Sequence, residues 1–233
     1  MKIEKFNAKI KKIEEISPTV REVTFELDKE IEFKPGSFVN VFVPFEGQEV
    51  RRAYSICSDS KNKKEVSISL RNMRFGKISP LFWEKDIQEK EFKIVGPLGV
   101  NTSDKITKNK VFLFSFGVGV SVIKGLLFDL LNRENIDSVT LFTGNRDEKE
   151  NLYKEYFEEL ARKNKKLKFV SVLSQPNDLS FQNKGYIQDF IDAEDFNDSD
   201  IYVCGPTKAC DSLIETINTK EPTNCLVMSE KFG

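Results

Sequence analysis

Residues 51–58, with the sequence RRAYSICS, place an arginine, a tyrosine and a serine close together in a stretch typical of a β-strand. Successive side chains of an extended chain alternate between its two faces, so we expect Arg52 and Tyr54 on one face and Ser55 on the other. Two interpretations are open. The segment is either a half-buried strand with a polar start, or a surface that binds a flat aromatic ligand carrying a phosphate.

A second candidate anion site follows in residues 74–84, RFGKISPLFWE. Ser79 suits the N-cap of a helix over residues 79–88 and Pro80 suits its first position. The N–H groups at such a helix start attract anions, with Gly76 nearby. An ordinary capped turn is the alternative. Phe75 and Trp83 could stack on a ligand or simply pack.

Two glycine-containing turns follow strands that read as fully buried. In SFGVGVSV, residues 115–122, Gly117 and Gly119 open a helix as in dinucleotide sites, but Val122 fills the third glycine position. In IYVCGPTKACDSL, residues 201–213, Cys204 ends a strand where open α/β sheets bind ligands. A buried cysteine beside a tight turn is the alternative.

Composition restricts the chemistry available to the chain. It has 233 residues, 39% of them hydrophobic, and 36 basic against 37 acidic residues, which argues against nucleic acid or anionic membrane as the main partner. Histidine is absent, which excludes Ser-His-Asp and Cys-His catalysis. The four cysteines lack metal-ligand spacing. Any difficult chemistry is therefore expected to come from a cofactor.

The chain has no apolar leader and no apolar run of the roughly 20 residues that cross a bilayer. We therefore expect a cytoplasmic protein without membrane insertion. Residues 1 to about 100 read as short strands separated by turns, which favours an antiparallel barrel or sandwich. From about residue 105, apolar strands alternate with helices, which indicates a covered parallel sheet. The predicted domains are residues 1–102 and 103–233.

The order of these motifs resembles the ferredoxin–NADP⁺ reductase superfamily over nearly the whole chain. The matching segments are RAYS, GKIS at residues 76–79, GPLG at 96–99, GVG at 117–119, CGP at 204–206 and the terminal SEKFG. The resemblance implies an antiparallel Greek-key β-barrel that binds flavin, followed by a Rossmann-like parallel-sheet domain that binds NAD(P). It also implies that Arg52 binds a flavin phosphate, that Tyr54 packs on the isoalloxazine ring, and that Ser55 hydrogen-bonds near the reactive nitrogen.

The resemblance assigns further residues by position. The implied catalytic residues are Ser55, Cys204 and Glu230. The implied cofactor-binding residues are Arg52, Ala53, Tyr54, Ser55, Arg71, Gly76, Lys77, Ile78, Ser79, Gly117, Val118, Gly119, Arg146, Cys204, Gly205 and Pro206. No metal ligand is implied.

The chain departs from the family pattern in its nucleotide loop and its coenzyme-specificity positions. Val118 and Val122 replace a threonine and a proline, and Gln175 stands where NADP-specific members often have an arginine. Arg146 could meet a 2′-phosphate or be structural. Coenzyme choice therefore stays open between NADH and NADPH, with a preference for NADH. FAD is expected as the flavin, with FMN as the alternative.

The implied function is transfer of hydride from NAD(P)H to flavin, followed by single-electron transfer to a separate acceptor. Ferredoxin, flavodoxin, an oxygenase component or a small electron acceptor would suit. The sequence has no fused ferredoxin domain, so an iron–sulfur centre would lie on another protein. The alternatives are a flavin-bearing relay or docking subunit with little turnover alone, and a member that has lost flavin.

Overall fold

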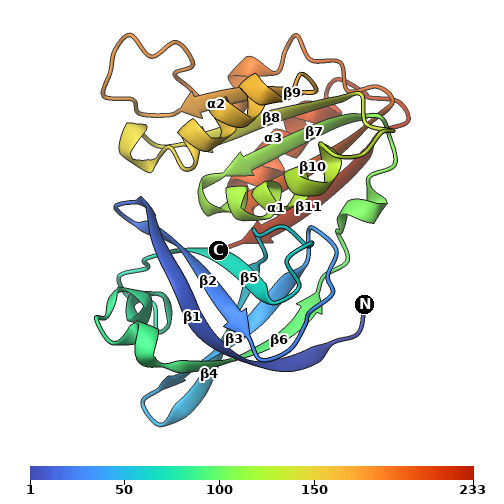
Figure 1. The fold of residues 1–233 in the computed structure, drawn as a ribbon. Coiled ribbons are helices and arrows are strands. Elements are labelled where there is room, and N and C mark those ends of the chain that lie inside the picture. Colours follow the sequence, from blue (N-terminus) through green and yellow to red (C-terminus); the bar gives the residue numbers. More distant parts are fainter.

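The computed structural model describes residues 1–233, apart from the side chain of Pro44. The chain forms an antiparallel sheet followed by a parallel one, stacked as two domains (Figure 1). This confirms the predicted fold class. Within the described part of the chain, no helix is both long enough and apolar enough to cross a membrane.

The first sheet is a six-stranded antiparallel barrel. Its strands are β1 (Glu4–Ser17), β2 (Val20–Leu27), β3 (Phe38–Phe45), β4 (Gln48–Ser55), β5 (Glu65–Arg71) and β6 (Glu91–Leu98). They lie in the order β4-β3-β6-β1-β2-β5, and a bridge between Ile56 and Ile68 joins the two edges. Buried side chains at alternate positions fill the interior, where the rings of Phe25, Phe82 and Phe92 contact one another.

The helix predicted over residues 79–88 is wrong. Two 3₁₀ turns, η1 (Ser79–Trp83) and η2 (Ile87–Glu89), take its place. The first turn ends because Glu84 adopts an extended conformation. Ser79 is not the N-cap, a position that Ile78 occupies. The Ser79 hydroxyl instead accepts a hydrogen bond from the Met73 backbone N–H at 3.0 Å.

The second sheet has five parallel strands in the order β11-β10-β7-β8-β9. They are β7 (Lys110–Phe116), β8 (Ser138–Asn145), β9 (Leu167–Leu173), β10 (Ser199–Pro206) and β11 (Leu226–Phe232). The chain reverses its direction of travel across the sheet between β7 and β10, so the carboxyl ends of these neighbours form the crevice where open α/β sheets bind ligands.

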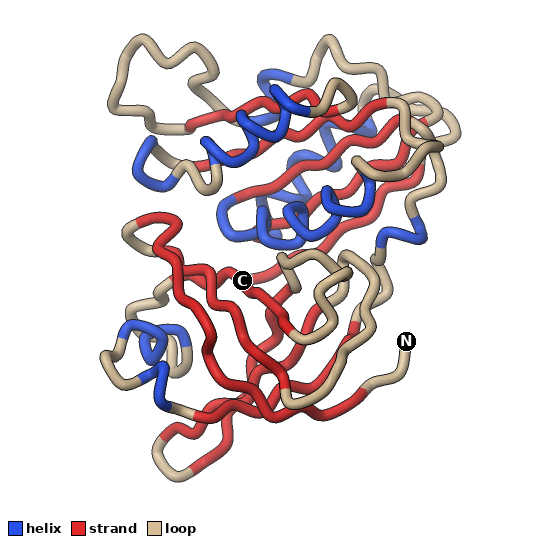
Figure 2. The backbone as a smooth tube through the Cα atoms, viewed as in Figure 1, coloured by secondary structure: helices blue, strands red, loops and turns tan.

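Helices cover both faces of the second sheet (Figure 2). The helices α1 (Val120–Leu130) and α2 (Lys154–Lys163) pack on one face. The other face is covered by α3 (Thr207–Asn218) and the 3₁₀ turn η6 (Ile187–Phe190). Because both faces are buried, the central strands β7 and β10 consist almost entirely of buried residues.

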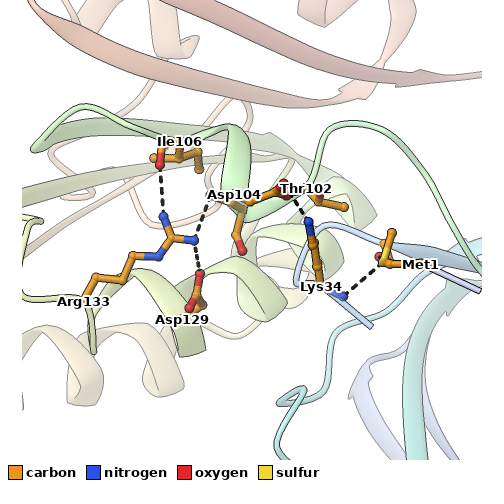
Figure 3. Close-up of polar contacts among 9 residues, drawn as sticks. Met1, Lys34, Thr102, Asp104, Ile106, Asp129 and Arg133 are labelled. Carbon is orange, nitrogen blue, oxygen red and sulfur yellow. Dashed lines mark hydrogen bonds and ion pairs between the residues drawn. The ribbon is translucent and has the colours of Figure 1, made fainter. Parts of the chain in front are cut away.

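The linker between β6 and β7, residues 99–109, is anchored from both domains (Figure 3). Lys34 of the barrel domain forms an ion pair with Asp104 of the linker at 2.8 Å. Arg133, which follows α1, donates to the backbone carbonyl oxygens of Ile106 at 3.0 Å and Ser103 at 2.8 Å. We propose that the domain boundary lies in this linker, after residue 102.

Candidate functional site

A cavity of about 2050 Å³ lies between the barrel and the carboxyl ends of the parallel strands. We call it the interdomain cavity. It is lined by residues 52–55 of β4, residues 76–79, the turns after β7 and β10, and the end of β11. All the implied catalytic and cofactor-binding residues line it except Gly205. Segments far apart in the sequence therefore meet at one place.

The RAYS segment forms the end of β4, an edge strand of the barrel. The strand register pairs Arg52 with Val41 and Tyr54 with Val39, so both side chains lie on one face, as strand alternation predicts. Arg52 is exposed, while Tyr54 packs against the barrel core. Burial raises the pKa of the Tyr54 phenol to about 12, so the ring is neutral and presents an apolar face.

The loop before η1 brings Gly76, Lys77, Ile78 and Ser79 to the same cavity. Lys77 is exposed there and, with Arg52, places two cationic side chains on the barrel side of the wall. The aromatic candidates lie elsewhere. Phe75 is 93% exposed and Trp83 packs beneath Arg21, whose guanidinium carbon lies 4.8 Å from the ring centroid. Neither ring lines the cavity.

The turns after β7 and β10 pack closely against each other where they line the cavity. Gly117–Gly119 forms a 3₁₀ turn, η4, and α1 follows it directly. A Cβ atom on Gly119 would collide with the carbonyl oxygen of Cys204. A Cβ atom on Gly205 would lie 2.7 Å from the Cβ of Phe116. Gly205 therefore packs against the neighbouring turn, which explains why it alone of the implied cofactor-binding residues does not line the cavity.

The three candidate catalytic residues come from both domains. Cys204 and Glu230 pair in the register of β10 and β11. Cys204 is 3% exposed, and burial raises the pKa of its thiol well above the ordinary value. Burial also raises the pKa of the Glu230 carboxyl, an effect that the nearby hydroxyls of Tyr202 and Ser55 partly offset. Ser55 of the barrel thus shares this corner with a neutral thiol and an easily protonated acid.

Arg71, at the end of β5, bridges the two domains. Its Nη1 donates to the Glu150 carboxylate at 2.6 Å and lies 2.5 Å from the Thr19 hydroxyl. Glu150 belongs to the 3₁₀ turn η5 (Glu148–Glu150) after β8. Thr19 and Glu150 could not be predicted as site residues, because no local sequence motif marks them.

The two positions singled out for coenzyme choice contact each other. Arg146, exposed at the end of β8, donates from Nε to the Gln175 side-chain oxygen at 3.1 Å. Arg146 lines the cavity at the edge formed by residues 144–147. The neutral glutamine therefore holds in place the one arginine that the sequence singled out for a 2′-phosphate.

Sequence reasoning missed one whole wall of the cavity. Lys208, Ser212 and Thr216 of α3 line it at a spacing of four residues, which places them on one helix face. Gln188 of η6 donates to the Ser212 hydroxyl at 3.0 Å across this wall. A stripe of polar residues at helical spacing was the signal that could have found it.

Comparisons with known proteins agree with this arrangement. A family model described as an oxidoreductase FAD-binding domain matches residues 7–102, and one described as an oxidoreductase NAD-binding domain matches residues 113–212. The chain is 27% identical to the reductase component of phenol 2-monooxygenase from Pseudomonas sp. strain CF600, over 92% of this chain. It is 28% identical to the phenol hydroxylase P5 protein of Acinetobacter pittii, over 99% of this chain.

The chain spans 62% and 66% of the lengths of these two relatives. Among solved structures, the Amycolatopsis cytochrome P450 reductase GcoB has the same fold. It matches 98% of this chain and 71% of its own length, with a TM-score of 0.84 at 20% identity. Because the FAD-binding and NAD-binding domain models together match most of the chain, the chain belongs to the ferredoxin–NADP⁺ reductase superfamily of oxidoreductases.

Proposed function

We propose that the chain transfers hydride from NAD(P)H to bound FAD and then passes single electrons to a separate redox acceptor. The observation that carries this proposal is the single interdomain cavity, in which the RAYS strand faces the ends of β10 and β11. Its volume of about 2050 Å³ exceeds the roughly 300–1,000 Å³ of an ordinary ligand pocket. Two large cofactors meeting at one point would need such a space.

The residues on the barrel side fit a flavin nucleotide. Arg52 and Lys77 supply exposed positive charge for a phosphate group. Tyr54 supplies a neutral aromatic face beside them. FAD is the proposed flavin because the family model that matches the barrel is an FAD-binding one. FMN would satisfy the same three side chains.

Bound flavin supplies the redox chemistry, which accepts two electrons and releases them one at a time. The protein's residues bind, orient and exclude water. Hydride transfer requires reacting atoms held about 3–3.5 Å apart and needs no protein base, which suits a chain without histidine. In our proposal Ser55 hydrogen-bonds near the hydride-accepting site, and the neutral Cys204 thiol excludes water from the nicotinamide site. Glu230 presents a carboxyl of raised pKa near Ser55.

We propose NADH as the preferred coenzyme. A 2′-phosphate needs positive charge, and guanidinium groups suit it best. Here Gln175 contributes no charge and its side-chain oxygen accepts from Arg146 Nε. Arg146 would therefore meet a 2′-phosphate without a second arginine beside it, whereas the ribose hydroxyl of NADH needs no positive charge.

We propose an oxygenase component as the acceptor, ahead of ferredoxin, flavodoxin or a small molecule. The name of one relative describes a reductase component of phenol 2-monooxygenase, which supports this order. Among the described residues, no group of His, Cys, Asp or Glu could hold a metal ion. An iron–sulfur electron carrier would therefore need ligands other than these residues.

The deciding experiment is an anaerobic visible spectrum of the purified protein, reconstituted with FAD, before and after NADH is added. We expect a flavin spectrum that bleaches within seconds, more slowly with NADPH. A flavin spectrum that persists with both coenzymes would favour the relay-subunit function instead. Failure to retain any flavin after incubation with FAD would contradict the assignment of the RAYS segment.

A further inference from the structure

The helix that begins at the Gly117–Gly119 turn rests directly on the barrel. Figure 1 shows α1 on the side of the second sheet that faces the barrel. The Ser121 hydroxyl donates to the Ser55 carbonyl oxygen at 3.4 Å. A Cβ atom on Gly125 would lie only 2.6 Å from the carbonyl oxygen of Ile56. The backbone just after the RAYS segment therefore contacts one face of α1.

A buried ion pair lies on that same face of α1. Lys124 Nζ contacts the Glu22 carboxylate of β2 at 2.6 Å, with the two side chains 13% and 8% exposed. The Tyr153 hydroxyl donates to the same Glu22 oxygen at 2.6 Å and lies 2.6 Å from the Ser69 hydroxyl. Lys124 Nζ also lies 4.9 Å from the centroid of the Tyr153 ring. Two groups of the second domain thus share one carboxylate of the barrel.

Such a cluster contributes little to stability, because the cost of removing two charges from water roughly cancels their attraction. Its directional contacts nevertheless fix the relative orientation of the side chains that form it. Lys124 is five residues beyond Gly119, and Ser121, Lys124 and Gly125 lie at helical spacing on the face that meets the barrel. The cluster therefore constrains the turn that opens α1 relative to the strand that ends at Ser55.

We propose that Lys124 and Glu22, supported by Tyr153, are positioning residues for hydride transfer. They hold the Gly117–Gly119 turn at a fixed place relative to the RAYS strand, and so set the separation of the two cofactor sites. This inference rests on the proposed function. Neither Lys124 nor Glu22 lines the interdomain cavity, so neither is expected to touch a cofactor.

The test compares Lys124→Met and Glu22→Gln with the wild-type protein by anaerobic stopped-flow reduction with NADH. We expect both variants to retain FAD with unchanged affinity and to bind NADH with a similar Kd. Their limiting rate of flavin reduction should fall roughly 10- to 100-fold, the effect of misplacing reactants by about 1 Å. Lys163→Met, which removes an exposed lysine paired with Glu159 on α2, is the matched control and should reduce at the wild-type rate.

A purely structural role would predict a different result. If either single variant fails to fold, the double variant Lys124→Met with Glu22→Leu replaces the pair by apolar groups, which commonly restores stability. We expect that protein to be stable and still slow. Reduction at the wild-type rate in any folded variant would overturn the inference while leaving the proposed function intact. A wild-type protein that NADH does not reduce would overturn both.

Discussion

Arg52 is the side chain on which flavin binding should depend most. It lies exposed on the cavity wall, beside the neutral ring of Tyr54. Charged hydrogen bonds contribute about 1.5–3 kcal/mol, so Arg52→Ala should raise the Kd for FAD roughly 10- to 150-fold. Titration of the protein with FAD measures this. Arg51→Ala is the control, since Arg51 does not line the cavity and its loss should leave FAD affinity unchanged.

Glu230 should make stability depend on pH. Burial raises the pKa of its carboxyl in the folded protein above 4.5. A group whose pKa is raised in the folded protein contributes stability at pH values below its pKa in the unfolded chain. That stability is lost as the pH rises through the pKa of the folded state. Stability should therefore be lower at neutral pH than at low pH, because burial disfavours the ionised form of Glu230.

Glu230→Gln should accordingly unfold at a higher temperature than the wild-type protein at pH 7, because it removes this buried charge. For a chain of this size, each kcal/mol added to the free energy of unfolding should raise the unfolding temperature by about 2–4 °C. The difference should vanish below pH 4, where the glutamate is also neutral. Thermal unfolding without added FAD, at both pH values, measures it. A gain that is the same at both pH values would contradict this explanation, as would an equal gain from the exposed Glu215→Gln.

At the scale of elements, the critical contact joins the turn after β7 to the end of β10. Gly119→Ala should destabilise the protein by about 1–3 kcal/mol, because its Cβ would collide with the Cys204 carbonyl oxygen. Gly117→Ala is the matched control: its φ of +53° carries a backbone cost, but the nearest atom lies 3.7 Å away. Denaturant unfolding compares the two. Equal losses of stability in the two variants would show that backbone conformation, rather than the contact with β10, causes the loss.

The sequence predicted most of these elements because their patterns are local. Apolar runs marked β7 and β10, and the polar–apolar pattern marked α3. The prediction of a helix over residues 79–88 was wrong because Ser79 resembles an N-cap residue in the sequence. In the folded chain its hydroxyl is engaged by the Met73 N–H, a contact that the local pattern does not reveal.

The candidate site was predicted only where a motif is continuous in sequence. Arg52 and Cys204 could be found from their neighbours. Glu150 could not, because its importance comes from contacts with Thr19 and Arg71, which are more than 75 residues away in the chain. Those contacts exist only where the two domains pack together.

At the scale of the whole molecule, the proposed reaction depends on the relative placement of two domains. The residues that line the interdomain cavity come partly from the barrel and partly from the domain of the parallel sheet. Three separate sets of contacts fix that placement: the Lys124–Glu22 pair, the Arg71–Glu150 pair and the anchored linker. The Arg133 anchor of the linker does not line the interdomain cavity, and neither do Ser103 and Ile106, so this contribution to domain placement can be tested without disturbing cofactor contacts.

Arg133 is the residue that ties the linker to the second domain, through the carbonyl oxygens of Ser103 and Ile106 (Figure 3). Arg133→Gln should cost about 1–3 kcal/mol, since it removes the donors from two backbone acceptors. It should also make residues 99–109 more susceptible to proteolysis, because the freed linker can open locally. Limited proteolysis and denaturant unfolding measure the two effects. Arg162→Gln, an exposed arginine on α2, should change neither. Loss of stability without faster cleavage in the linker would mean that Arg133 acts on α1 alone.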